Sequence, residues 1–202
     1  MNTRQLLVSL WTLVIKEVRR FMRIWPQTLL PPSITMTMYF IIFGSLIGSR
    51  IGEMDGISYM AYIVPGLIMM SVITNSYSNV ASSFFSNKFQ RSVEEMMVSP
   101  MPSWVILSGF VLGGMARGLG VGLIVTGVSF FFTDLAIHHP LVTLGVVVMT
   151  AALFSIGGFI NALVPHKFDD ISIVPIFVLT PLTYLGGVFY SIIMPPAFWQ
   201  RV

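Results

Sequence analysis

Long runs without a charged residue alternate along this chain with short charged segments. No Asp, Glu, Lys or Arg occurs within residues 24–49, 56–87, 135–166 or 171–200. A helix needs about 20 mostly apolar residues to cross the hydrocarbon core of a bilayer, because each residue adds about 1.5 Å. The pattern therefore predicts an all-α membrane protein, a helical bundle with five spans at residues 27–48, 59–83, 105–133, 141–163 and 171–190.

Residues 5–25, ahead of the first predicted span, have the spacing of an amphipathic helix. Its basic side chains recur at i, i+3, i+4 and i+7 and share one face: Lys16, Arg19, Arg20 and Arg23. Aromatic and aliphatic residues, including Trp11 and Trp25, occupy the opposite face. This pattern is typical of a helix in the headgroup plane of a membrane, and Pro26 separates it from the first span. We therefore predict an interfacial helix over residues 1–26; an amphipathic helix packed on protein is the alternative.

A second amphipathic segment lies between the second and third spans, at about residues 88–99. Its apolar residues share one helical face: Phe89, Val93, Met96 and Met97. Pro100 and Pro102 then end the pattern. The spacing predicts a helix of about three turns that projects from the bundle and offers a soluble partner a docking surface. A solvated helix without a partner fits the spacing equally well.

Small and polar residues mark particular positions inside the spans. Gly114, Gly118 and Gly122 repeat every four residues, which lets a neighbouring helix approach closely in lipid. Pro65, Pro175 and Pro181 are expected to kink or interrupt their spans. The serines, threonine and asparagines within residues 71–83 either form hydrogen bonds between helices or line a wet cavity.

Composition and charge support the membrane assignment and orient the chain. Apolar residues make up 55% of the 202 positions and charged residues 9%, with a mean hydropathy of +0.85. So few charged side chains cannot cover the surface of a soluble domain. With the N-terminus in the cytoplasm, nine of the 11 basic residues fall on the inner side. The basic balance thus reports topology, and no nucleic-acid partner is expected.

The residues needed for most site chemistry are missing or far apart. Cysteine is absent, and His138 and His139 belong to the opposite side of the membrane from His166, so neither a metal site nor catalytic residues are expected. A phosphate-binding loop needs Gly before its Lys. The three lysines, Lys16, Lys88 and Lys167, all lack that glycine. Any ATP-driven transport must therefore use an ATPase on another chain.

Three segments resemble the ABC-2 type transporter permeases: residues 62–70, 89–100 and 168–190. The resemblance implies six spans, a homodimer in the bacterial inner membrane, and a separate ATP-binding-cassette subunit that holds ATP and Mg²⁺, with no cofactor in this chain. It makes residues 27–190 the transmembrane domain and 88–99 a coupling helix. Residues 191–202 would begin an external re-entrant element, and the sixth span would lie beyond a C-terminal truncation. The contacts it implies for the ATPase are Gln90, Arg91, Glu94, Glu95 and Met97.

The leading hypothesis is therefore the permease subunit of an ABC-2 type exporter. An ion-driven carrier or channel is the alternative. Such proteins usually carry an ionisable residue near the middle of the membrane, and Arg117 is the central candidate. A membrane-embedded enzyme lacks a credible site, and a membrane anchor would bind a partner without moving a substrate. Residues that contact a substrate cannot be assigned.

Overall fold

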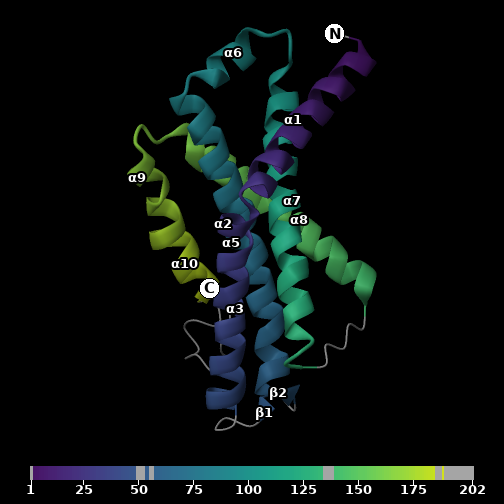
Figure 1. Ribbon diagram of the computed structural model, residues 1–202, viewed down its shortest axis with the longest axis vertical. Helices are drawn as coiled ribbons and strands as arrows, with labels where there is room; N and C mark the ends of the chain where they lie inside the picture. Colours follow the sequence, from purple (N-terminus) through teal and green to yellow (C-terminus); the bar gives the residue numbers. More distant parts are fainter. Residues whose placement is uncertain (1, 49–52, 55–56, 134–138, 185–187, 189–202) are drawn as a thin grey trace, which may run out of the picture.

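The computed structural model describes residues 2–48, 53–54, 57–133, 139–184 and 188. The segment predicted as external and re-entrant, residues 191–202, lies outside these ranges. Three long helices form the centre: α5 (Tyr59–Phe89), α7 (Ser103–Ser129) and α8 (Pro140–Leu163). In the described part of the chain, these three are long and apolar enough to cross a membrane. Helix α5 packs against both others, and α8 crosses the pair and diverges to one side (Figure 1).

The N-terminal segment is broken into several helices. Helix α1 (Thr3–Arg23) begins with a capping box, in which Asn2 Oδ1 accepts from the Thr3 amide at 3.0 Å and Gln5 Oε1 accepts from the Asn2 amide at 2.9 Å. Helices α2 (Trp25–Thr28) and α3 (Leu30–Ile41) follow, and a π-helical stretch, η1 (Ile42–Ile47), ends the segment.

The first predicted span, residues 27–48, is therefore not one regular helix. Prolines occupy the first turns of both α2 and α3, where the missing amide hydrogen is not needed. Each proline thus starts a helix but cannot continue the one before it.

Two two-residue strands, β1 (Glu53–Met54) and β2 (Ile57–Ser58), pair antiparallel ahead of α5. Ser58 Oγ accepts from the Ala61 amide at 3.3 Å and caps α5. Of the two effects expected at Pro65, a kink or an interruption, the structure excludes the interruption, because α5 runs through Pro65 without a break. Helix α5 also ends six residues beyond the predicted span. A single proline removes one backbone hydrogen bond, which the packing of a 31-residue helix tolerates.

The C-terminal described segment is discontinuous. It comprises helix α9 (Phe168–Ile171), a π-helical stretch η2 (Pro175–Leu179) and helix α10 (Thr180–Thr183). Pro175 and Pro181 lack amide hydrogens, and Thr180 Oγ1 donates to the Pro175 carbonyl at 2.9 Å. The prolines were expected to kink or interrupt the span at residues 171–190. In the described part of that span, the regular α-helix is indeed interrupted.

Two buried apolar clusters hold the bundle together. One joins α1, α5, α7, α8 and η2 around Leu13, Phe84, Phe85 and Phe110. The other joins α3, α5 and α7 around residues that include Phe40 and Ile63. The first cluster lies toward the end of the molecule that carries the N-terminus and α6 (Ser92–Val98), and the second toward the hairpin (Figure 1).

Candidate functional site

A buried carboxylate fastens α1 to α5. Glu17 is fully buried, and its Oε2 atom accepts from Arg20 Nε at 3.3 Å and from Ser83 Oγ at 2.5 Å. Arg20 Nη2 in turn donates to Asn79 Oδ1 at 2.8 Å and to the Asn79 carbonyl at 3.3 Å. The two ionised side chains of α1 therefore bind three polar groups on α5, which extends the local ion pair into a network between helices.

Glycines of α7 make room for this cluster. A Cβ placed at Gly109 would lie 2.2 Å from Leu13 Cδ2, and one at Gly113 would lie 2.5 Å from Glu17 Cβ. Both helices advance by four residues between these contacts, so α1 and α7 run side by side in the same direction. Without side chains at these positions, the backbone of α7 approaches α1 closely enough to bury Glu17.

The predicted basic face of α1 divides into two parts. Lys16 Nζ donates to Asn87 Oδ1 at 2.9 Å, and Arg20 binds Asn79, so both contact α5. Arg19 and Arg23 are exposed. The shared face is therefore partly occupied by α5, which lies beneath Lys16 and Arg20. Trp11 and Trp25 on the apolar side are 66% and 50% exposed.

Sequence reasoning missed Glu17, whereas Asn79 and Ser83 belong to the polar residues at 71–83 and form the hydrogen bonds between helices that were one of the two expectations for them. A signal was present in the spacing. Glu17 lies four residues from Leu13 and four from Phe21, both buried, and it is the one acidic residue in the first 52 positions. An isolated carboxylate in an apolar row indicates a partner on another helix, because an unpaired buried charge is costly.

Arg117 lies on α7, next to the same network. Its Nη2 atom donates to the Thr28 carbonyl at 3.4 Å, while its Nε atom is buried without a hydrogen-bond partner. The candidate for an ion-coupling residue therefore binds the carbonyl at the end of α2, next to the junction between α2 and α3.

The glycines predicted to mediate helix packing face α5 and α8. A Cβ at Gly114 would lie 2.3 Å from Val80 Cγ2 and 2.7 Å from Ser155 Oγ. At Gly118 it would lie 1.8 Å from Ser76 Oγ, and at Gly122 it would lie 2.6 Å from Val72 Cγ2. Even one methyl group at these positions would overlap the neighbouring helix.

The proposed coupling segment is shorter than predicted. Lys88 and Phe89 belong to α5, and the chain then turns at Arg91, whose φ is +59°, into the seven-residue α6. The expectation of a three-turn helix with Phe89 on its apolar face is wrong. A left-handed residue between the two helices changes the chain direction and destroys the register between them.

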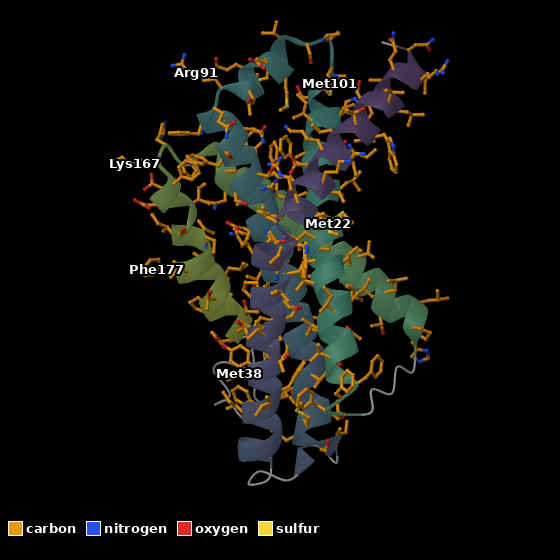
Figure 2. All side chains as sticks on the ribbon, viewed as in Figure 1. Met22, Met38, Arg91, Met101, Lys167 and Phe177 are labelled. Carbon is orange, nitrogen blue, oxygen red and sulfur yellow. The ribbon has the colours of Figure 1, made fainter. Side chains whose placement is uncertain are left out.

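Within α6, apolar side chains point both inward and outward. Val93 and Met96 pack against the cluster of Phe84, Phe85 and Phe110. Met97 and Val98 are 72% and 88% exposed. Among the other predicted contact residues, all four are exposed: Gln90, Arg91, Glu94 and Glu95. Arg91 lies with Met101 at the end of the molecule opposite Met38 (Figure 2).

A corner formed by α8 and α9 is held against the C-terminal end of α5. Lys88 Nζ donates to the carbonyls of Leu163 at 2.5 Å and Pro165 at 3.1 Å, which lie at the C-terminus of α8. Phe168 makes edge-to-face contacts with Phe85 and Phe89, at centroid distances of 4.8 and 5.1 Å. A cation at a helix C-terminus satisfies carbonyls that have no partner inside the helix.

Replacing Lys88 with methionine is expected to loosen this corner while keeping most of the apolar stem. Each lost bond from a charged donor to a carbonyl should cost about 1 kcal/mol, since Lys88 is only half-buried. Hydrogen exchange at residues 164–171 should accelerate. Lys167→Met, which removes an exposed lysine from the same corner, is the matched control and should leave exchange unchanged.

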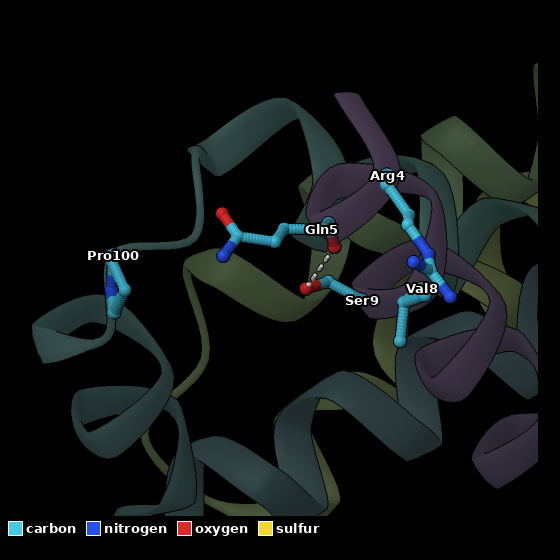
Figure 3. Close-up of a pocket in the computed structure, with 5 residues that line it drawn as sticks. All are labelled: Arg4, Gln5, Val8, Ser9 and Pro100. Carbon is cyan, nitrogen blue, oxygen red and sulfur yellow. Dashed lines mark hydrogen bonds between the residues drawn. The ribbon is translucent and has the colours of Figure 1, made fainter. Parts of the chain in front are cut away.

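A cleft of about 420 Å³ opens beside α6, between the first turns of α1 and the connection from α6 to α7. Its lining residues are Arg4, Gln5, Val8, Ser9 and Pro100. Pro100 faces α1 across the opening, and Ser9 Oγ donates to the Gln5 carbonyl at 2.9 Å (Figure 3). The surface at this end of the molecule therefore includes the start of α1 as well as α6.

The arrangement is that of a helical membrane subunit with a short helix projecting from one end. Residues 8–202 match the family model described as ABC-2 type transporter, so the chain belongs to the ABC-2 type transporter family. Members of this class are permeases, membrane subunits that are not catalytic on their own. The family and its relatives place the chain in the inner membrane.

Two groups of relatives extend this finding. The chain is 62% identical over 194 residues to the inner membrane transport permease YadH of Escherichia coli (strain K12), covering 96% of this chain and 75% of the relative. It is 25% identical over 170 residues to nodulation protein J of Rhizobium leguminosarum bv. viciae, covering 82% of this chain and 64% of the relative. No solved structure matches the chain.

Proposed function

We propose that this chain is the permease subunit of an ABC-2 type exporter, which moves a substrate across the inner membrane with ATP hydrolysed, together with Mg²⁺, on a separate ATP-binding-cassette subunit. The observation that carries the proposal is the placement of α6, one side of which packs on the core while the other is exposed, in a chain of this family. Val93 and Met96 anchor α6 in the core, while Glu94, Glu95 and Met97 are exposed. An element that is anchored on one side and exposed on the other can pass a partner's movement into α5 and α7.

The orientation, span number and oligomeric state belong to the same proposal. The N-terminus and α6 lie together at one end (Figure 1), and the excess of basic residues on that side supports a cytoplasmic location. Residues 27–48 and 171–190 add two interrupted spans to α5, α7 and α8, since breaks are tolerated where neighbouring groups satisfy the backbone. Exposed apolar side chains on α3 and α8, such as Met38 and Met149, supply surface for lipid or for a second copy in a homodimer.

Substituting both Glu94 and Glu95 with alanine is expected to weaken ATPase binding. Losing two charges at the contact should reduce copurification of the cassette subunit by about tenfold and reduce substrate-dependent ATP hydrolysis. Both carboxylates are exposed, so folding should be preserved. The measurement is pull-down from membranes that contain both subunits, followed by transport in proteoliposomes.

Glu53→Ala, an acidic substitution on β1 at the opposite end, is the matched control and should leave ATPase binding intact. Unchanged binding and ATP-dependent transport in the double variant would contradict docking on α6. Ion flux through the chain without any ATPase would instead favour an ion-driven carrier or channel.

A further inference from the structure

The last turn of α5 holds the corner between α8 and α9 (residues 161–171) in place. Lys88 Nζ donates to the carbonyl oxygens of Leu163 at 2.5 Å and of Pro165 at 3.1 Å. The Phe168 ring packs edge to face on two phenylalanine rings of α5. Hydrogen bonds and ring contacts are short-ranged and weaken steeply when the groups separate. The corner should therefore follow the end of α5 when that end moves.

The segment that begins at this corner is interrupted and covered on one side only. Asn161 Nδ2 donates to the Ile171 carbonyl at 3.1 Å, which fastens α9 to α8. Beyond this bond, α9, η2 and α10 are four, five and four residues long. Leu179 is buried, whereas Ile176 and Phe177 are 58% and 73% exposed. A helix that is broken at prolines bends at the breaks. The position of η2 and α10 thus depends on where the corner holds α9.

Helix α6 packs against the same place. Lys88 lies three residues before the turn at Arg91, from which α6 begins. Val93 and Met96 of α6 pack against the buried cluster that also contains Ile171 of α9. Figure 1 shows α9 at the left of the bundle, below α6. A displacement of α6 therefore acts on the end of α5 and on α9 together.

We propose that Lys88 is a positioning residue for transport, because it couples α6 to the segment from α9 to α10. When α6 and the last turn of α5 move, the bonds from Lys88 carry the end of α8 and the start of α9 with them. The breaks at η2 let the rest of the segment take up a second position. The inference rests on the proposed function, in which a separate ATPase displaces α6, and it adds the element that responds.

Spin labels can measure this movement, because the chain has no cysteine of its own. One label is placed at Phe177→Cys on η2 and the other at Leu123→Cys on α7, and both positions are highly exposed. The labelled permease is reconstituted with its cassette subunit in proteoliposomes. Double electron–electron resonance gives the distance between the labels without nucleotide and with ATP plus vanadate. In the original chain, ATP plus vanadate should shift this distance.

Lys88→Met should lose the shift while the cassette subunit still copurifies, because the Lys88 side chain binds the end of α8 and not the exposed surface of α6. Lys88→Arg keeps a charged donor and should restore the shift. Lys167→Met, which removes an exposed lysine from the same corner, is the matched control and should behave as the original chain.

Three results would overturn the inference. They are an undiminished shift in Lys88→Met, no shift in the original chain with the cassette subunit bound, and loss of the cassette subunit from Lys88→Met, which would assign Lys88 a merely structural role. An original chain that binds no cassette subunit would instead overturn the proposed function, and this inference with it.

Discussion

Glu17→Ala is expected to lower the free energy of unfolding by on the order of 3 kcal/mol, the largest loss for any single carboxylate in the described chain. The substitution leaves Arg20 without its ionic partner and the Ser83 hydroxyl without its acceptor. It also opens space where the side chain packs against Gly113. Partial exposure of Arg20 moderates the cost, because water can solvate part of its charge. Urea unfolding in detergent, followed by circular dichroism, measures the difference.

Two further variants separate the sources of this loss. Glu17→Gln keeps the shape and one acceptor but removes the charge, so its cost should be about half that of alanine. Glu95→Ala removes an exposed carboxylate from α6 and should be neutral within about 0.5 kcal/mol. If Glu17→Ala were as stable as the original chain, the network between α1 and α5 would make no contribution to folding.

Gly118→Ala is expected to destabilise the contact between α5 and α7 by roughly 1–3 kcal/mol. The added methyl carbon would lie 1.8 Å from Ser76 Oγ and 3.0 Å from the Val72 carbonyl oxygen. Rotating the serine hydroxyl relieves the first overlap but not the second, so the helices must move apart. The same unfolding measurement applies, and cross-linking between α5 and α7 would report the increased separation.

Gly120→Ala is the matched control, two residues along the same helix. Nothing lies within 4 Å of a Cβ at Gly120, so the change should be neutral or stabilising, because alanine favours helix. Adding Ser76→Gly to Gly118→Ala should restore part of the loss by removing the obstructing side chain. Equal effects of Gly118→Ala and Gly120→Ala would show that helix propensity, and not close packing, governs the glycines of α7.

The sequence alone determined where the long membrane helices lie, because their position depends on runs of apolar residues. The long apolar runs located α5, α7 and α8 to within six residues at each end, because a long apolar stretch in lipid has to satisfy its backbone as a helix. The glycines at positions 114, 118 and 122 marked one face of α7 by their spacing. The resemblance of three segments indicated the family, and the lysines without a preceding glycine indicated that any ATPase lies on another chain.

The tertiary structure alone decided which side chains meet. Glu17 contacts Ser83 across 66 positions, and this pairing depends on how α1 crosses α5 and on the space left by Gly113. The turn at Arg91 separates Phe89 from α6, which periodicity cannot reveal because it reports the register of one uninterrupted helix. Sequence patterns thus describe each helix by itself, whereas the position of the buried charge is set by contacts among three helices.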